Sequence, residues 1–182
     1  MEKYSWWTDK QKQLADEAKE VIDRLMPMAQ EDSWTLTYPW RVVGDCARRG
    51  WYGALIPNKY GGSFEDWGVT GACIIAEEMG RLGALCNDFI GSSCTGGISQ
   101  LLGFGTDEQK QRWFPKICRG ELHSCVCITE PYIGSDTSAL ETKCVRDGDF
   151  YILNGKKRFI SNALAADNYM AVSYTHLRAH ET

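Results

Sequence analysis

Apolar residues recur every three or four positions through the first part of the chain, a spacing typical of amphipathic helices. Thr8 and Thr106 each precede a glutamine three positions later, as in a capping box that starts a helix. We therefore expect a domain made of helices. The expected helices cover about 8–26, 38–50, 66–80, 88–103 and 106–119.

The same spacing selects the residues that should face the core. These are Leu14, Ala18, Val21 and Leu25 in the first helix; Trp40, Val43 and Ala47 in the second; Val69, Cys73, Ile74 and Ala76 in the third; and Trp113, Phe114 and Ile117 in the last. Pro27 should end the first helix and Gly50 the second. Gly61 and Gly62, in the following loop, should supply backbone conformations with positive φ.

After Gly120 the pattern changes to short apolar runs of the kind found in strands. The expected strands cover 124–129, 141–145, 150–153 and, after a hairpin turn at Asn154-Gly155, 157–161. The chain should thus have an α+β fold, with an N-terminal all-α helical bundle domain followed by the beginning of an antiparallel β-barrel-like domain, which is incomplete. We place the helical domain at 1–121 and the β domain at 122–172.

Composition narrows the class of protein. With 182 residues, 43% of them hydrophobic, the chain can bury a core of ordinary size. The formal net charge of -4 and the lack of clustered Lys and Arg argue against a nucleic acid partner. The first residues do not have the pattern of a signal peptide, and no apolar run approaches the roughly 20 residues of a membrane helix. We therefore expect a cytoplasmic protein with no membrane partner.

The eight cysteines are expected to be free thiols, because disulfide frameworks belong to small secreted domains. The closest pair, Cys125 and Cys127, would place both thiols on one face of a strand. That spacing does not match the paired Cys-x-x-Cys pattern of zinc sites. No metal site is expected.

A loop rich in hydroxyl groups follows the first expected strand and has the sequence Thr129-Glu130-Pro131-Tyr132-Ile133-Gly134-Ser135-Asp136. Its glycine would let the main chain approach a ligand, and Thr129 and Ser135 could hydrogen-bond ring or phosphate oxygens. Taken by itself, the pattern also fits an ordinary polar turn after a strand.

This loop resembles the T-E-P-x-x-G-S-D signature of the acyl-CoA dehydrogenase family, and other motifs of that family flank it in the same order. The similarity extends over about residues 8–170, which makes it far more specific than one short motif. The other segments are 50–62, similar to G-x-x-G-x-x-I-P-x-x-Y-G-G; 77–81, similar to E-E-L-G-R; 105–121, similar to G-T-x-E-Q-K-x-x-x-L-P with its G-E turn; and 153–162, similar to L-N-G-x-K-x-W-I-[ST]-N.

The resemblance implies that flavin adenine dinucleotide (FAD) binds against the β domain. It places Val126, Ile128 and Thr129 along the isoalloxazine ring and Ser161 near flavin N5. Phe159 stands where the family usually has Trp; it can still pack flat on the ring, but it lacks the indole N–H. Without the resemblance, Phe159 and Ile128 would be interpreted as ordinary core residues.

The resemblance also assigns residues to the acyl-CoA substrate. Ser135 matches a serine that contacts both the phosphate region of the cofactor and the acyl-CoA. Thr95 lies in a segment that helps to form the acyl pocket. Glu130 is expected to be structural, because the family's catalytic glutamate belongs to its C-terminal helical domain. No catalytic residue is therefore expected within this chain.

The implied reaction oxidises an acyl-CoA thioester to the trans-2-enoyl-CoA: a glutamate removes the α-proton while hydride leaves the β-carbon for flavin N5. Electrons would then pass to an electron-transfer flavoprotein, and the whole protein should be a homo-oligomer, a dimer or a tetramer. We expect the present chain to be a fragment that is inactive alone. The alternatives are a flavin-dependent oxidase or monooxygenase of the same superfamily, and a non-catalytic helical interaction module.

The last residues, 173–182, depart from the family pattern. They resemble the translation of a sequencing-library adapter, and we expect them not to be biological. His176 and His180 should therefore have no functional role, although their spacing would suit a metal.

Overall fold

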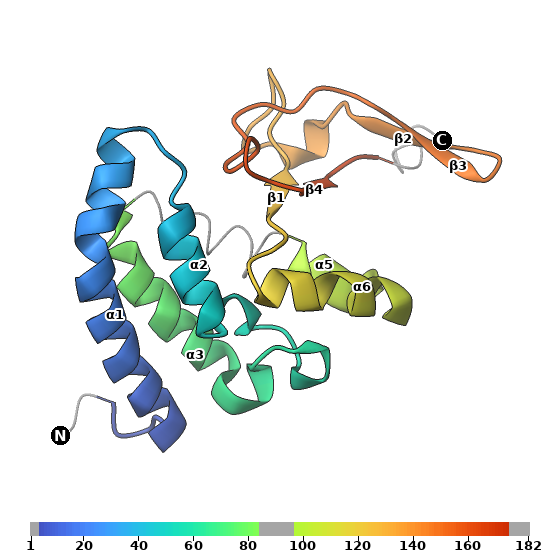
Figure 1. Ribbon diagram of the computed structural model, residues 1–182. Helices are drawn as coiled ribbons and strands as arrows, with labels where there is room; N and C mark the ends of the chain where they lie inside the picture. The colour runs from blue at the N-terminus through green and yellow to red at the C-terminus, as the bar shows by residue number, and fades with distance from the viewer. Residues whose placement is uncertain (1–3, 84–96, 175–182) are drawn as a thin grey trace.

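Helices come first in the chain and strands follow (Figure 1). The computed structural model describes residues 4–83 and 97–174. The helices are α1 (Asp9–Trp34), α2 (Trp40–Arg48), α3 (Phe64–Gly80), α5 (Ile98–Phe104) and α6 (Asp107–Cys118). The strands are β1 (Ser124–Cys127), β2 (Lys143–Asp147), β3 (Phe150–Asn154) and β4 (Asn168–Ala171). The expected α+β class, a helical domain followed by the start of a β domain, is confirmed.

The first helix, α1, is longer than the sequence predicts. The Thr8 hydroxyl accepts a hydrogen bond from the amide of Gln11, whose side chain accepts one from the amide of Thr8, so the expected capping box is confirmed. The four expected core residues are buried. The prediction that Pro27 ends the helix is wrong, because α1 continues to Trp34. Ala29, beyond the proline, is buried in the core, and this packing offsets the hydrogen bond that Pro27 cannot donate.

The second helix, α2, falls within the expected range of 38–50 but is shorter at both ends and has a different core face. Val43 and Ala47 are buried as predicted. Trp40 is half exposed, because it stands at the first position of the helix and its ring packs edge-on against His123, 5.0 Å away. Gly50 has φ +76, the left-handed conformation expected of a glycine that follows a helix.

In α3 the core face is rotated from the predicted one. Ile74 is buried and Ala76 is half-buried, but Val69 and Cys73 are exposed, so these two predictions are wrong. Gly68, with φ 61 and ψ -167, interrupts the helix just before this stretch and changes its phase. The other buried residues of the helix are Gly71, Ala72, Ile75 and Met79.

The loop glycines have different roles. Gly61 has φ +89, and a Cβ there would meet open space. Gly62 does not have a positive φ; instead, a Cβ at this position would overlap the carbonyl group of Ile56. The expectation of positive φ is therefore confirmed for Gly61 and wrong for Gly62, where glycine is needed because two backbone segments approach each other.

Two hydrophobic clusters form the core of the helical domain. The larger one joins α1, α2 and α3. The smaller one joins α5 and α6 to Ile56 and Tyr60, and Phe114 and Ile117 of α6 are buried in it as predicted, with Trp113 at its margin. The helix expected at 88–103 falls partly outside the described residues. The part of this range that the structure describes, from residue 97 on, contains most of α5.

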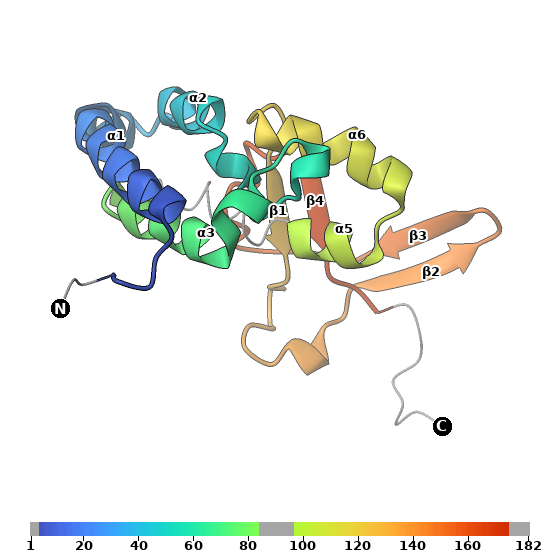
Figure 2. The same ribbon diagram turned by 90° about the horizontal axis from the view of Figure 1, so that it is seen from below.

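The strands pair in two separate sheets. β1 and β4 are parallel, with Ser124 opposite Asn168 and Cys127 opposite Ala171. β2 and β3 form an antiparallel hairpin that projects away from the helices (Figure 2). This hairpin turns at Gly148, so the predicted hairpin turn at Asn154-Gly155 and the strand at 157–161 are wrong.

The reason for this difference is a close contact at Gly155. A Cβ at this position would overlap the side chain of Thr142, which precedes β2. Because Gly155 has no side chain, its backbone can pass close to the Thr142 side chain. The chain therefore leaves the hairpin here and does not turn back along it.

His123 connects the helical and β parts of the chain. Its backbone amide donates to the carboxylate of Asp167, and its carbonyl accepts from the amides of Asp167 and Asn168 at 2.8 and 3.1 Å. Its buried ring contacts the rings of Tyr38, Trp40 and Tyr52 edge-on. The junction therefore fixes the start of β1 against both β4 and the helices.

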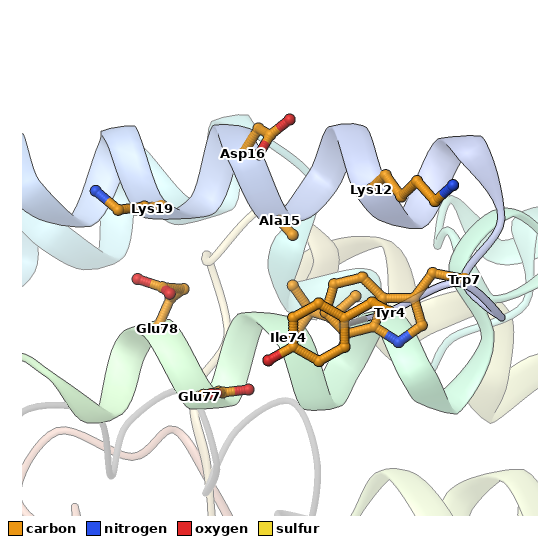
Figure 3. Close-up of a pocket in the computed structure, with 9 residues that line it drawn as sticks. All are labelled: Tyr4, Trp7, Lys12, Ala15, Asp16, Lys19, Ile74, Glu77 and Glu78. Carbon is orange, nitrogen blue, oxygen red and sulfur yellow. The ribbon is translucent and has the colours of Figure 1, made fainter. Parts of the chain in front are cut away.

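A groove of about 410 Å³ lies along the surface of α1 and α3 near the start of the chain (Figure 3). Tyr4 stacks on Trp7 at 3.9 Å and closes one end of it. The rest of the groove is lined by Lys12, Asp16 and Lys19 of α1 and by Glu77 and Glu78 of α3, among others. None of the described helices is both long and apolar enough to cross a membrane.

The two loop glycines give a test of this fold. We expect Gly62→Ala to lower the free energy of unfolding by about 3 kcal/mol, because the new methyl group would displace the Ile56 backbone. Gly61→Ala, the matched control, should cost only about 1 kcal/mol, from its positive φ. Urea unfolding followed by circular dichroism measures both, and equal losses would contradict the assignment.

Candidate functional site at the end of strand β1

The two faces of β1 differ in burial. Cys125 and Cys127 are buried, with their sulfur atoms 3.9 Å apart, as expected for thiols on one face of a strand. Burial, with Cys127 alongside, raises the pKa of the Cys125 thiol to about 12, so this thiol is protonated at neutral pH. On the opposite face Val126 is half-buried and Ile128 is 37% exposed. This second face is the one available to a ligand.

A tight turn follows β1. The amide of Glu130 donates to the carbonyl of Ile133 at 3.0 Å, and the amide of Ile133 donates to the carbonyl of Glu130 at 3.2 Å. Pro131 and Tyr132 form the tip of this turn, and Tyr132 is almost fully exposed. The turn directs the Glu130 side chain inward.

The Glu130 carboxylate is buried and receives four hydrogen bonds. One oxygen accepts from the amide of Thr142 at 3.0 Å, from the Thr142 hydroxyl, and from the ammonium of Lys157 at 2.9 Å. The other oxygen accepts from the amide of Glu141 at 2.7 Å. Every side of the carboxylate is therefore satisfied, which supports the expectation that Glu130 is structural.

Burial alone raises the pKa of the Glu130 carboxyl, because it disfavours the charged form. Hydrogen bonds outweigh this effect and lower the pKa to about 2. The donors are the side chains of Thr142 and Lys157 and the backbone amides of Glu141 and Thr142. Glu130 is therefore ionised at neutral pH and a poor proton acceptor.

Lys157 brings a distant segment of the chain to this turn. Its ammonium also donates to the carbonyl of Ile128 at 2.9 Å, and the neighbouring amide of Arg158 donates to the carbonyl of Thr129 at 2.9 Å. These bonds hold Phe159 beside the end of β1. We call Val126, Ile128, Thr129 and Phe159 the β1 surface.

Phe159 is held in an unusual conformation. Its φ of 56 is rare for a residue with a side chain, and its ring is 77% exposed. The guanidinium of Arg158 lies 4.1 Å from the ring centroid and covers one face. With so much of the ring exposed, the other face remains open to a ligand. Strained, exposed aromatic residues of this kind are typical of functional sites.

The remaining predicted site residues are not joined to the β1 surface. Ser135 and Ser161 are both exposed. In the part of the chain that the structure describes, no hydrogen bond links either serine side chain to the four residues of that surface. Thr95, the other residue predicted to contact substrate, lies outside the described residues.

The sequence interpretation missed the residues that organise the site. Lys157 and Thr142 satisfy Glu130, yet neither was predicted to have a role. The sequence gives only an indirect signal: a structural carboxylate that becomes buried needs a cation or other donors, and Lys157 lies within the motif at 153–162.

The last described residue, Tyr174, is held next to this site. Its amide donates to the carbonyl of Thr142, its carbonyl accepts from the amide of Cys144, and its hydroxyl donates to the carbonyl of Ser138. His176 and His180 lie outside the described residues. The nature of residues 173–182 stays a prediction.

Comparison with known proteins points to one family. The N-terminal domain model of the acyl-CoA dehydrogenases matches residues 8–121, and the middle domain model matches residues 125–182. A 3-(aryl)acrylate reductase from Clostridium sporogenes is 34% identical over 83% of this chain and 40% of its own length. An acyl-CoA dehydrogenase from Bacillus subtilis is 30% identical over 90% of this chain and 42% of its own length.

A solved structure has the same arrangement of elements. The glutaryl-coenzyme A dehydrogenase in complex with glutaryl-CoA superimposes with a TM-score of 0.86 and 29% identity, over 93% of this chain and 44% of that one. The present chain therefore spans less than half the length of the relatives that it matches.

The low pKa of Glu130 makes the fold sensitive to acid. Because its folded-state pKa of about 2 is below the usual 4.5, the ionised carboxylate stabilises the fold above pH 4.5. This contribution should disappear as pH falls from 4.5 towards 2. We expect Glu130→Gln to lower the free energy of unfolding at pH 7 by about 3 kcal/mol. The variant should also flatten the pH dependence of the free energy of unfolding between pH 4.5 and pH 2. Urea unfolding at a series of pH values measures both effects.

Glu141→Gln is the matched control for this experiment. The Glu141 side chain is exposed, and only its backbone amide contacts Glu130. This variant should keep the stability and the acid sensitivity of the original chain. A Glu130→Gln protein with an unchanged pH profile would show that the carboxylate does not have the described environment.

Proposed function

Because the chain belongs to the acyl-CoA dehydrogenase family, we propose that it forms part of an FAD-dependent enzyme that oxidises an acyl-CoA thioester to the trans-2-enoyl-CoA. The chain covers about 40% of its relatives' length, so the catalytic glutamate is proposed to belong to a part of the protein outside these 182 residues. These residues would supply a flavin-contacting surface, and the chain alone would not turn over substrate.

The single observation that carries this proposal is the β1 surface. An isoalloxazine ring needs a flat apolar contact with hydroxyl groups at its polar edge. Exposed Ile128 and the exposed aromatic Phe159 offer apolar contact, and Thr129, whose carbonyl accepts from the amide of Arg158, offers a hydroxyl group next to Ile128 in the chain. The residues present therefore fit a flavin ring.

When bound, FAD would supply the acceptor for the hydride that leaves the β-carbon of the substrate. In this proposal Val126 and Ile128 support the ring, and the hydroxyls of Thr129 and Ser161 bind its polar edge. Ser135 would contact both the phosphate region of FAD and the acyl-CoA, and Thr95 would contribute to acyl-CoA binding. Phe159 would stack on the ring and exclude water from it.

Glu130 is unsuited to be the base of this reaction. A base must accept the α-proton of the substrate, so its pKa should lie near the working pH. The pKa of Glu130 is about 2, and both carboxylate oxygens already accept hydrogen bonds. This supports the proposal that the base lies elsewhere in the protein.

The β2–β3 hairpin supports the proposal that more of the β domain covers these strands. Its apolar side chains Val145, Phe150, Ile152 and Leu153 are all more than half exposed. A two-stranded hairpin is marginally stable in water and needs a further layer to bury such residues. We propose that additional strands of the same protein form this layer.

The proposed partners follow from the family. The substrate would be an acyl-CoA, the electron acceptor an electron-transfer flavoprotein, and the whole protein a homo-oligomer, either a dimer or a tetramer. A flavin-dependent oxidase of the same superfamily would differ in that its reduced form reacts rapidly with oxygen.

The whole protein provides the test. It should purify with bound FAD, and a saturated acyl-CoA added without oxygen should bleach the flavin absorbance and yield the enoyl-CoA. Slow recolouring in air would support a dehydrogenase, and rapid recolouring an oxidase. A folded, colourless protein that does not take up added FAD would overturn the proposal.

Phe159 should contribute to FAD affinity through its ring. In the whole protein, Phe159→Leu should weaken FAD binding about tenfold, from the loss of aromatic stacking. Phe159→Trp should bind at least as well as the original. Phe104→Leu, at an exposed aromatic residue on α5, is the control and should leave affinity unchanged. Equal affinities for Phe159→Leu and the original, measured by titrating the apoprotein with FAD, would remove Phe159 from the site.

A further inference from the structure

Arg158 precedes the proposed flavin contact in the chain, yet the family motif assigns it no role. In the motif L-N-G-x-K-x-W-I-[ST]-N, which residues 153–162 resemble, Arg158 stands at the second variable position, between Lys157 and Phe159. Its backbone amide donates to the carbonyl of Thr129 at 2.9 Å, so its backbone is held just after β1. Its side chain is exposed and carries a charge whose placement needs an explanation.

The guanidinium of Arg158 has an aromatic ring as its neighbour and no carboxylate. Its Cζ atom lies 4.1 Å from the centroid of the Phe159 ring. Within residues 4–83 and 97–174, no salt bridge or side-chain hydrogen bond involves this guanidinium. Other arginines in these ranges pair with carboxylates: Arg24, Arg41, Arg48, Arg49, Arg81 and Arg119. The Phe159 ring is therefore the structural partner of Arg158.

The backbone of Phe159 explains how two consecutive side chains meet. In an extended chain, successive side chains point to opposite faces, which would separate a guanidinium from the ring that follows it. Phe159 has φ 56, outside the extended and right-handed helical regions. This left-handed conformation ends the alternation and lets the ring lie under the guanidinium of Arg158. The unfavourable backbone conformation therefore comes together with a specific side-chain contact.

This contact limits how the Phe159 ring is presented to a ligand. Phe159 is 77% exposed, and no other aromatic ring or cation of the described residues contacts it. An exposed ring with so little support would otherwise change rotamer rapidly. A tryptophan at this position would be larger and would bring an indole N–H as an additional anchor. The guanidinium compensates for the smaller ring, because it holds one face and leaves the other to a flat ligand.

We propose that Arg158 is a positioning residue for the flavin. By stacking on one face of the Phe159 ring, its guanidinium fixes the orientation in which the opposite face receives the isoalloxazine. This inference rests on the proposed function and extends it to a residue that the family motif does not specify. Arg158 acts through Phe159 and not by its own contact with flavin or substrate, so its effect requires the aromatic ring.

A double-mutant cycle in the whole protein tests this dependence. The four proteins are the original, Arg158→Met, Phe159→Leu and the combined variant, and each apoprotein is titrated with FAD. Arg158→Met keeps an apolar stem and removes the charge. It should weaken FAD binding about threefold when Phe159 is present, as expected for an exposed cation–π contact. In the Phe159→Leu background the same substitution should change the affinity by less than about 1.5-fold.

Two further variants separate this effect from a general attraction between positive charge and the FAD phosphates. Lys156→Met removes the same charge from a nearby exposed side chain and should leave the affinity unchanged. The Lys156 ammonium makes no ion pair or hydrogen bond among the described residues. Arg158→Lys keeps a cation that can lie over the ring, so it should weaken FAD binding less than Arg158→Met does.

Three outcomes would overturn the inference while leaving the proposed function intact. They are an FAD affinity that Arg158→Met leaves unchanged, an equal loss with and without the Phe159 ring, and an equal loss in Lys156→Met. The last two would mean that the charge acts on FAD at a distance and not through the ring. An original protein that binds no FAD would overturn the proposed function itself, and this inference with it.

Discussion

The candidate site depends on one buried ion pair, between Glu130 and Lys157. Both side chains are almost removed from water, so each charge must be compensated within the protein. Glu130 meets this requirement with hydrogen bonds from Thr142 and Glu141, and Lys157 with a second bond to the carbonyl of Ile128. The turn after β1, the residues just before β2 and the segment that follows β3 are thereby held together. In that last segment the amide of Arg158 donates to the carbonyl of Thr129, which holds the backbone of Phe159 beside the end of β1.

The two buried acidic side chains among the described residues differ in how fully they are compensated. Glu130 has donors at both oxygens, which lowers its pKa and makes it a structural residue. Asp32 has a donor at one oxygen only. The first arrangement fixes the turn after β1, whereas the second leaves one buried oxygen without a hydrogen-bond partner among the described residues.

His123 has a related role at the boundary between the helices and the strands. Its backbone pairs with Asp167 and Asn168 and so aligns β1 with β4, while its ring is packed among aromatic residues of the helical domain. Strand β1 is therefore fixed to the helical core, whereas the β2–β3 hairpin projects away from it (Figure 2).

The sequence alone determined the local features of this protein: the capping boxes at Thr8 and Thr106, the change from helices to strands after Gly120, and the family motif around Thr129. These depend on neighbours a few positions apart in the chain. Tertiary structure decided the rest. The helix crosses Pro27 because Ala29 is buried, and Asn154-Gly155 makes no hairpin because Gly155 passes over Thr142. Lys157 reaches Glu130 only after folding, since residues 27 positions apart meet through packing that no local pattern records.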